Sequence, residues 1–279
     1  MARNLLARLE VKSMRIRFLQ IITGLLFIVA AVTARAQQPF VTDDTDVTDK
    51  GKLHFETSFE SDSLPRTSLP VANQTLTRAE FDYGLFRHFE IGVNFPFLTL
   101  SDKSADGSRV TGGIGDITFG AKYNLWRERE NSRLPALTVS GFLQIPSGSA
   151  PRRLGSGITD YGFNAIVQKS YRKKNVVRVN AGMILAGNSL SGVLGIPARG
   201  TIFTGGASFV REISGKLQLG AEITGAVTNN FRLSAGQLQM QGGGNYKISK
   251  KTTFDFGLIA GRFAASPRLG GKIGFSVDF

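Results

Sequence analysis

Charged side chains that could pair, hold water or impose an electric field recur at alternate positions in parts of this sequence. Arg78, Glu80 and Asp82 form the densest run, and Glu90 follows on the next stretch. Alternate residues of an extended chain point to the same side, so these charges would share one face. Charges of both signs around a narrow passage sort solutes by charge, and we take these four residues as the best candidates for a constriction.

Residues that would support an enzyme are few. Nucleophilic catalysis needs a serine or cysteine activated by a base. The sequence has no cysteine and two histidines, of which His54 falls on the inward face of the first predicted strand and His88 at a turn. No G-x-S-x-G motif is present, and the acidic stretch 42–49 departs from the spacing of a calcium loop. We therefore predict no enzymatic activity, no catalytic or metal-binding residues and no cofactor.

Strict alternation of apolar and polar residues indicates that β-strands position these charges. In the stretch 250–261, Phe254, Phe256 and Leu258 alternate with polar residues and glycine. The pattern predicts twelve strands, long enough to cross a bilayer at a tilt. Their expected ranges are 52–61, 74–86, 88–99, 113–125, 135–146, 158–171, 175–187, 200–211, 215–227, 235–248, 250–262 and 269–279.

The connections between the predicted strands alternate in length. Short charged turns alternate with longer loops rich in Ser, Gly, Pro and Asp, such as 62–73, 100–112 and 147–157. Bacterial outer-membrane barrels have short periplasmic turns and longer extracellular loops. We therefore predict an all-β fold, an antiparallel up-and-down transmembrane β-barrel of about 12 strands. Aromatic residues that suit a bilayer interface gather near the short turns: Tyr83, Tyr123, Trp126, Tyr171 and Tyr246.

Three segments are expected along the chain. Residues 1–36 combine basic residues, a short apolar run over 18–32 and an A-x-A ending, which predicts a cleaved secretory signal peptide. Residues 37–51 form a polar N-terminal segment that could fold into the lumen as a plug, or remain a periplasmic tail or a lead-in to the first strand. Residues 52–279 would form the barrel.

The net charge of the chain is +13, but the predicted signal peptide carries much of it. Its removal takes away six basic residues and one acidic residue and leaves +8. The remaining sequence contains no basic helix and no basic–aromatic motif. We therefore expect no nucleic-acid partner.

The strand register assigns many charges and glycines to the lumen. They could line a solute path, or they could form a salt-bridged interior that fills a narrow barrel. Ten inward glycines, among them Gly84, Gly120, Gly162, Gly206 and Gly220, would leave room for a solute. The candidate lumen and constriction residues are Arg78, Glu80, Asp82, Glu90, Asp116, Lys122, Arg178, Glu222, Asp255 and Lys272.

Four stretches of this chain resemble a known family. They are PFVTDDTD at 39–46, GKLHFE at 51–56, GIGDITFGAKY at 113–123 and GITDYGF at 157–163. Together they resemble the outer-membrane family labelled "putative meta-pathway of phenol degradation". The resemblance implies a barrel that admits hydrophobic or aromatic compounds, and it brings no substrate-binding residues. The terminal Phe279, after an alternating strand, resembles the signal that barrel-assembly machinery recognises.

These observations predict a monomeric channel in the bacterial outer membrane for passive passage of small hydrophobic or aromatic molecules. Its expected partners are outer-membrane lipid, the barrel-assembly machinery and the solute. The alternative is a structural or adhesin-like barrel with a filled lumen, whose long loops bind a ligand.

Overall fold

A computed structural model describes residues 39–104, 107–129, 133–172, 174–186, 194–196, 200–229 and 232–279. The predicted signal peptide over 1–36 lies outside the described residues. No helix within the described ranges is long and apolar enough to cross a membrane.

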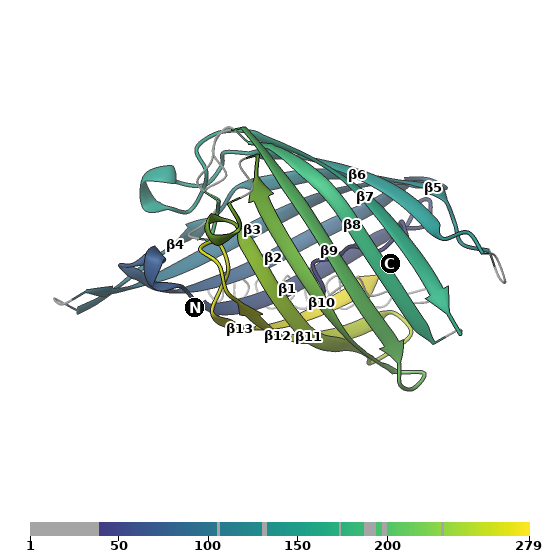
Figure 1. The fold of residues 1–279 in the computed structure, drawn as a ribbon. Helices are drawn as coiled ribbons and strands as arrows, with labels where there is room; N and C mark the ends of the chain where they lie inside the picture. Colours follow the sequence, from purple (N-terminus) through teal and green to yellow (C-terminus); the bar gives the residue numbers. More distant parts are fainter. Residues whose placement is uncertain are drawn as a thin grey trace, which may run out of the picture.

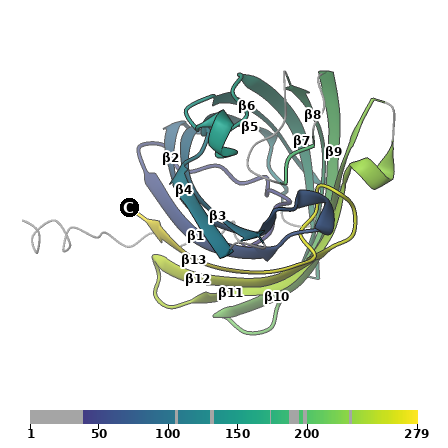
Figure 2. The ribbon, with the colours of Figure 1, turned by 90° about the vertical axis from the view of Figure 1, so that its left-hand side faces the viewer.

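The described strands join into one antiparallel sheet that closes on itself (Figures 1 and 2). β1 pairs with β2 on one side and with the last strand, β13, on the other. The strands are β1 (Leu53–Ser63), β2 (Val71–Phe86), β3 (Phe89–Ser104), β4 (Gly107–Ile114), β5 (Ile117–Trp126), β6 (Ala136–Ile145), β7 (Asp160–Tyr171), β8 (Asn175–Ala186), β9 (Gly200–Glu212), β10 (Leu217–Thr228), β11 (Gln237–Lys247), β12 (Thr252–Gly261) and β13 (Leu269–Asp278). Short 3-10 helices lie in the longer loops: η1 (Arg66–Ser68), η2 (Ala150–Arg152) and η3 (Leu233–Ala235).

Twelve strands close the wall, which confirms the predicted fold, and β4 is an additional strand. β3 pairs with β5 over its first part and with β4 over its second part, so β4 and β5 follow each other along β3. Gly115 and Asp116 separate them. The predicted loop over 100–112 is therefore wrong, because Ser, Asp and Gly in this stretch form a paired hairpin instead. The predicted single strand 113–125 is divided for the same reason.

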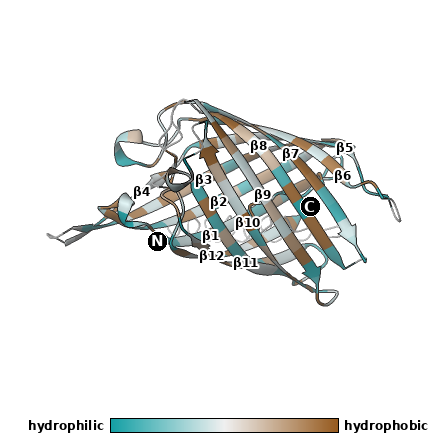
Figure 3. Cartoon of the chain, viewed as in Figure 1, coloured by the Kyte–Doolittle hydropathy of each residue, from teal (hydrophilic) through white to brown (hydrophobic). Residues whose placement is uncertain are grey.

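The barrel carries its large apolar side chains outside and its charges inside. On β12 and β13, Leu258 and Ile273 are 71% and 48% exposed, whereas Asp255 and Lys272 are 1% and 4% exposed. Hydrophobic and hydrophilic residues are interspersed along the strands (Figure 3). A soluble protein would place these two faces the other way round, so an outer face of this kind matches a lipid environment.

Aromatic side chains surround the short-turn end of the barrel. Tyr83, Tyr123, Trp126, Tyr171 and Tyr246 are all exposed, as expected for a girdle at a bilayer interface. The Trp126 Nε1 donates a hydrogen bond to the carbonyl oxygen of Pro135 at 2.7 Å, which fixes the indole beside the turn.

The long-loop end of the lumen contains two apolar clusters. In the first, Leu154 from the loop after β6 packs against inward residues of β2 and β3. In the second, Ile196 and Ala265 from two further loops pack against β9 and β10. The loops therefore place packed apolar side chains at this mouth of the barrel. The buried members are Leu64, Val71, Leu76, Leu98, Leu100 and Leu154, and Ile196, Ile202, Ala226 and Ala265.

If lipid surrounds β10, the stability lost when arginine replaces an outward residue should depend on the depth of that residue in the bilayer. Ile223 is exposed on the outer face near the middle of the strand, and the half-buried Leu217 shares that face at the short-turn end. We expect Ile223→Arg to lower the free energy of unfolding in lipid vesicles by about 2–4 kcal/mol, and Leu217→Arg by about 0–1 kcal/mol. Reversible denaturant unfolding in vesicles measures both. Equal costs at the two positions would contradict a bilayer around this strand.

Candidate lumen site

The inner segment, residues 39–51, runs inside the barrel before β1 begins (Figure 2). Phe40, Thr42, Asp44, Thr45 and Val47 are all buried. Their partners lie on strands from around the wall, as the following contacts show. The inner segment therefore shares the lumen with the candidate charges.

Glu222 on β10 holds the first part of the inner segment. Its two carboxylate oxygens accept hydrogen bonds from the backbone N–H groups of Val41 and Thr42, at 2.7 and 2.8 Å. Gln241 and Lys272 donate to the carbonyl oxygen of Pro39, at 2.6 and 3.4 Å. Three strands near the end of the chain thus satisfy backbone groups of its start.

Lys122 on β5 holds the middle of the inner segment through charge. Its Nζ lies 2.9 Å from Asp43 Oδ1, 3.3 Å from Asp44 Oδ1 and 3.9 Å from Glu90 Oε1. Arg178 on β8 approaches the other oxygen of Asp44, at 3.9 Å. Burial alone would raise the pKa of Asp44, but Lys122 and Arg178 hold that pKa below its ordinary value. Asp44 is therefore ionised and bound between two cations.

The last part of the inner segment lies against the short-turn end of the wall. Asn124 Nδ2 and Thr138 Oγ1 both donate to the carbonyl oxygen of Thr45, each at 2.8 Å. The N–H of Gly51 donates to the carbonyl oxygen of Gly84 at 2.7 Å. A Cβ on Gly84 would lie 2.1 Å from the carbonyl oxygen of Asp49, so only glycine permits this approach.

Several inward glycines accommodate protein atoms, which corrects the expectation that they leave room for a solute. A Cβ on Gly206 would lie 2.9 Å from Thr42 Oγ1, and one on Gly220 would lie 2.9 Å from the Phe40 ring. Gly162 lies beneath the ring of Phe142. Gly120, by contrast, has no atom within 4 Å of its Cβ position and faces open space.

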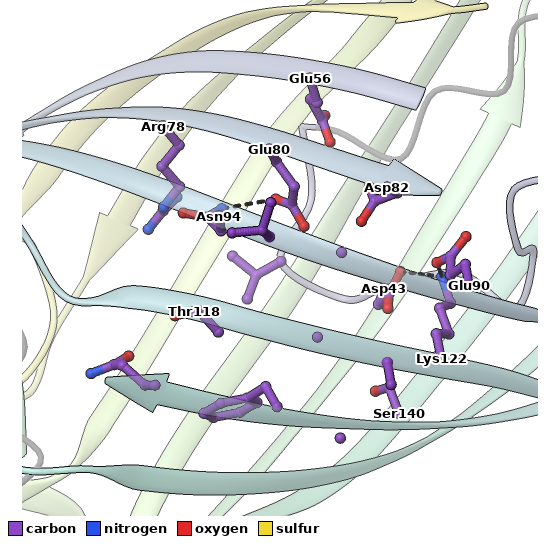
Figure 4. Close-up of a pocket in the computed structure, with 18 of the residues that line it drawn as sticks. Asp43, Glu56, Arg78, Glu80, Asp82, Glu90, Asn94, Thr118, Lys122 and Ser140 are labelled. Carbon is purple, nitrogen blue, oxygen red and sulfur yellow. Dashed lines mark hydrogen bonds and ion pairs between the residues drawn. The ribbon is translucent and has the colours of Figure 1, made fainter. Parts of the chain in front are cut away.

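A cavity of about 450 Å³ remains between the inner segment and the wall (Figure 4). Six candidate residues line it: Arg78, Glu80, Asp82, Glu90, Lys122 and Lys272. Asp43, Glu56 and Phe142 also line it, although the candidate set did not include them. The alternation of the first strand already placed Glu56 inward, whereas an inward aromatic such as Phe142 departs from the pattern of its neighbours.

The other four candidates do not line this cavity. Arg178 and Glu222 hold the inner segment, and Asp255 is buried on β12. Asp116 lies between β4 and β5 and accepts hydrogen bonds from the backbone N–H groups of Gly148 and Ser156, at 2.9 and 2.6 Å. Asp116 therefore holds the loop between β6 and β7.

Substitution of Lys122 tests whether this residue holds the inner segment in the lumen. Lys122→Met removes the cation from Asp43, Asp44 and Glu90, and breaking a buried pair in this way costs about 3–5 kcal/mol. We expect the inner segment to leave its place. Because the chain has no native cysteine, Thr45→Cys provides a single buried reporter. Its labelling by a membrane-impermeant maleimide should become at least tenfold faster when Lys122→Met is added.

The control for this experiment is Lys169→Met. It removes a lysine that pairs with Glu128 at a short turn, away from the lumen, and should leave the labelling rate unchanged. Unchanged labelling with Lys122→Met would contradict its role in holding the inner segment.

The fold of this chain is that of known outer-membrane proteins. An outer membrane channel from Pseudomonas putida F1 superimposes with a TM-score of 0.62 at 13% identity, over 87% of this chain and 99% of the other. The KdgM porin superimposes with a TM-score of 0.54 at 8% identity, over 81% and 99%. The NanC porin gives 0.52 at 10% identity, over 81% and 98%.

The sequence itself identifies the family. No curated protein matches the chain. The model of the family described as "Putative MetA-pathway of phenol degradation" matches residues 42–279, which include most of the inner segment and the whole barrel. The chain therefore belongs to this family.

Proposed function

We propose that this protein is a channel of the bacterial outer membrane for passive passage of small molecules. The observation that carries the proposal is the cavity of about 450 Å³, which lies inside a closed barrel and is lined by charged residues. A barrel of twelve strands is wider than one of eight, whose interior side chains alone can fill. The similarity in fold to an outer membrane channel and to porins supports the proposal.

We further propose that hydrophobic or aromatic molecules are the solutes. The ring of Phe142, which lines the lumen cavity, supports this class, because an aromatic solute can pack against it. The family description, which refers to phenol degradation, points to the same class.

The inner segment would act as a plug in this channel. Glu222 on β10 and Lys122 and Asn124 on β5 hold it from two different strands, and its bulk occupies lumen that a solute would need. Passage of anything larger than the remaining cavity would require the inner segment to move.

A structural or adhesin-like role is the second candidate. The observation that favours it is the same filling of the lumen, since a barrel closed by its own N-terminal segment can serve as an anchor for its loops. In that case the barrel would conduct neither ions nor solutes.

In either role we expect a monomer. A signal peptide over 1–36 would direct its export across the inner membrane and would then be cleaved. Barrel-assembly machinery would recognise its last strand. Phe279, exposed on the outer face at the end of that strand, is the residue such machinery would contact.

Single-channel conductance tests the plug. Deletion of residues 37–49 removes the atoms that fill the lumen but retains Gly51, whose backbone pairs with Gly84. We expect conductance to rise several-fold over that of the intact mature chain. Equal conductance of the two proteins would rule out a plug, and no conductance from either would favour the structural role.

Uptake into liposomes tests the solute class. We expect phenyl glucoside to enter liposomes containing this protein faster than the smaller methyl glucoside. Uptake that follows size alone would contradict an aromatic preference. Uptake equal to that of empty liposomes for both sugars would contradict the channel itself.

A further inference from the structure

Three carboxylates form an acidic wall on one side of the lumen cavity. Glu56 on β1 lies directly opposite Glu80 on β2, and Asp82 follows Glu80 on the same face. Their side chains point into the cavity (Figure 4). Glu56 is 3% exposed, and its Oε1 has no hydrogen-bond partner among the described residues. Like charges directly opposite each other in a sheet repel, so this arrangement calls for a positive group.

The basic residues of the cavity are bound elsewhere. Arg78 lies 3.8 Å from Glu60, and Lys272 donates to the carbonyl oxygen of Pro39. Lys122 is surrounded by carboxylates of its own, as described above. Within the described ranges, no arginine or lysine lies at ion-pair distance from Glu56, Glu80 or Asp82.

Other neighbours of the acidic wall make few direct contacts with its carboxyl groups. Asn94 donates one hydrogen bond to Glu80 at 2.9 Å. His54 lies opposite Asp82 across the strands, but its Nδ1 contacts Asp278 at 2.6 Å. The acidic wall is therefore a buried group of three carboxyl groups with few direct hydrogen-bond partners.

The floor beside the acidic wall contains two glycines and ends at an aromatic ring. One register row runs from Asp82 through Gly92 and Gly120 to Phe142. Three steps between neighbouring strands separate the first and last of these residues, about 14 Å along the wall. The carboxyl group of Asp82 lies over Gly92, Gly120 faces open space, and the ring of Phe142 lies over Gly162 at the far end of the row.

We propose that the acidic wall binds the ammonium group of a small aromatic amine, whose ring lies over Gly120 toward Phe142. A carboxylate and an ammonium form a strong charge-assisted hydrogen bond, and the volume of the cavity suits a small ligand. This inference rests on the proposed channel function and specifies which aromatic molecules the channel favours. A metal ion is a poorer match, because no group of metal-binding side chains is found in the described part of the chain.

Calorimetric titration of the full mature chain in detergent tests the inference. The ligands are benzylammonium, benzyl alcohol and benzoate, which share a ring and differ in charge, and empty micelles provide the baseline. We expect benzylammonium to bind at least tenfold more tightly than benzoate, with benzyl alcohol between them. Equal binding of the three, or tighter binding of benzoate, would overturn the inference.

Two variants locate the site. Glu56→Gln together with Glu80→Gln should weaken benzylammonium binding at least tenfold, and this double variant removes repulsion and so should fold as well as the parent. Phe142→Ala should weaken benzylammonium but leave methylammonium unchanged. The matched control, Asp102→Asn on the β3–β4 hairpin, removes a charge outside the cavity and should bind as the parent does. Unchanged binding of benzylammonium in the double variant would show that the acidic wall is not its site, and would overturn the inference.

Competition and conductance separate the remaining outcomes. Calcium that displaces benzylammonium at equal concentration would indicate an inorganic cation site and overturn the inference. Conductance without any preference for benzylammonium would contradict this inference but would remain consistent with the proposed channel function. Preferential binding without conductance would support the site and contradict the channel.

Discussion

Closure of the sheet through β1 and β13 is the constraint on which the rest of this structure depends. In an apolar solvent an unpaired strand edge would leave backbone groups without hydrogen bonds, and the β1–β13 pairing removes that edge. Closure also divides the side chains into two sets, because successive residues of a strand point to opposite faces. Every charge on the inward set must then find water, a partner or a ligand within one enclosed space.

The inner segment answers part of this requirement. It brings Asp43 and Asp44 to Lys122, and it offers backbone N–H groups to Glu222. The wall in turn donates hydrogen bonds to the carbonyl oxygens of Pro39 and Thr45. The wall and the inner segment are thus complementary in charge and in hydrogen bonding, and the acidic wall is one part of the lumen that this complementarity does not reach.

The alternation of residues predicted much of the architecture, because a two-residue period and a change in loop length depend only on local sequence. It gave twelve wall strands and the inward face of Glu80, Lys122 and Lys272. It could not predict the β3–β4 hairpin, since Ser101 and Asp102 are typical of loops and only their pairing partners make them a strand. It also could not show that Glu222 and Arg178 face the inner segment instead of a solute, because these contacts join residues far apart in the sequence.

The separation of these contacts along the chain has a consequence for how the protein folds. The hydrogen bond from Val41 to Glu222 spans 181 positions, and that from Lys272 to Pro39 spans 233. Chains dominated by such distant contacts fold slowly, because the entropy of closing long loops is lost before the contacts form. The inner segment therefore reaches its final place only after the last strand has arrived, and it is among the last of the described parts to order.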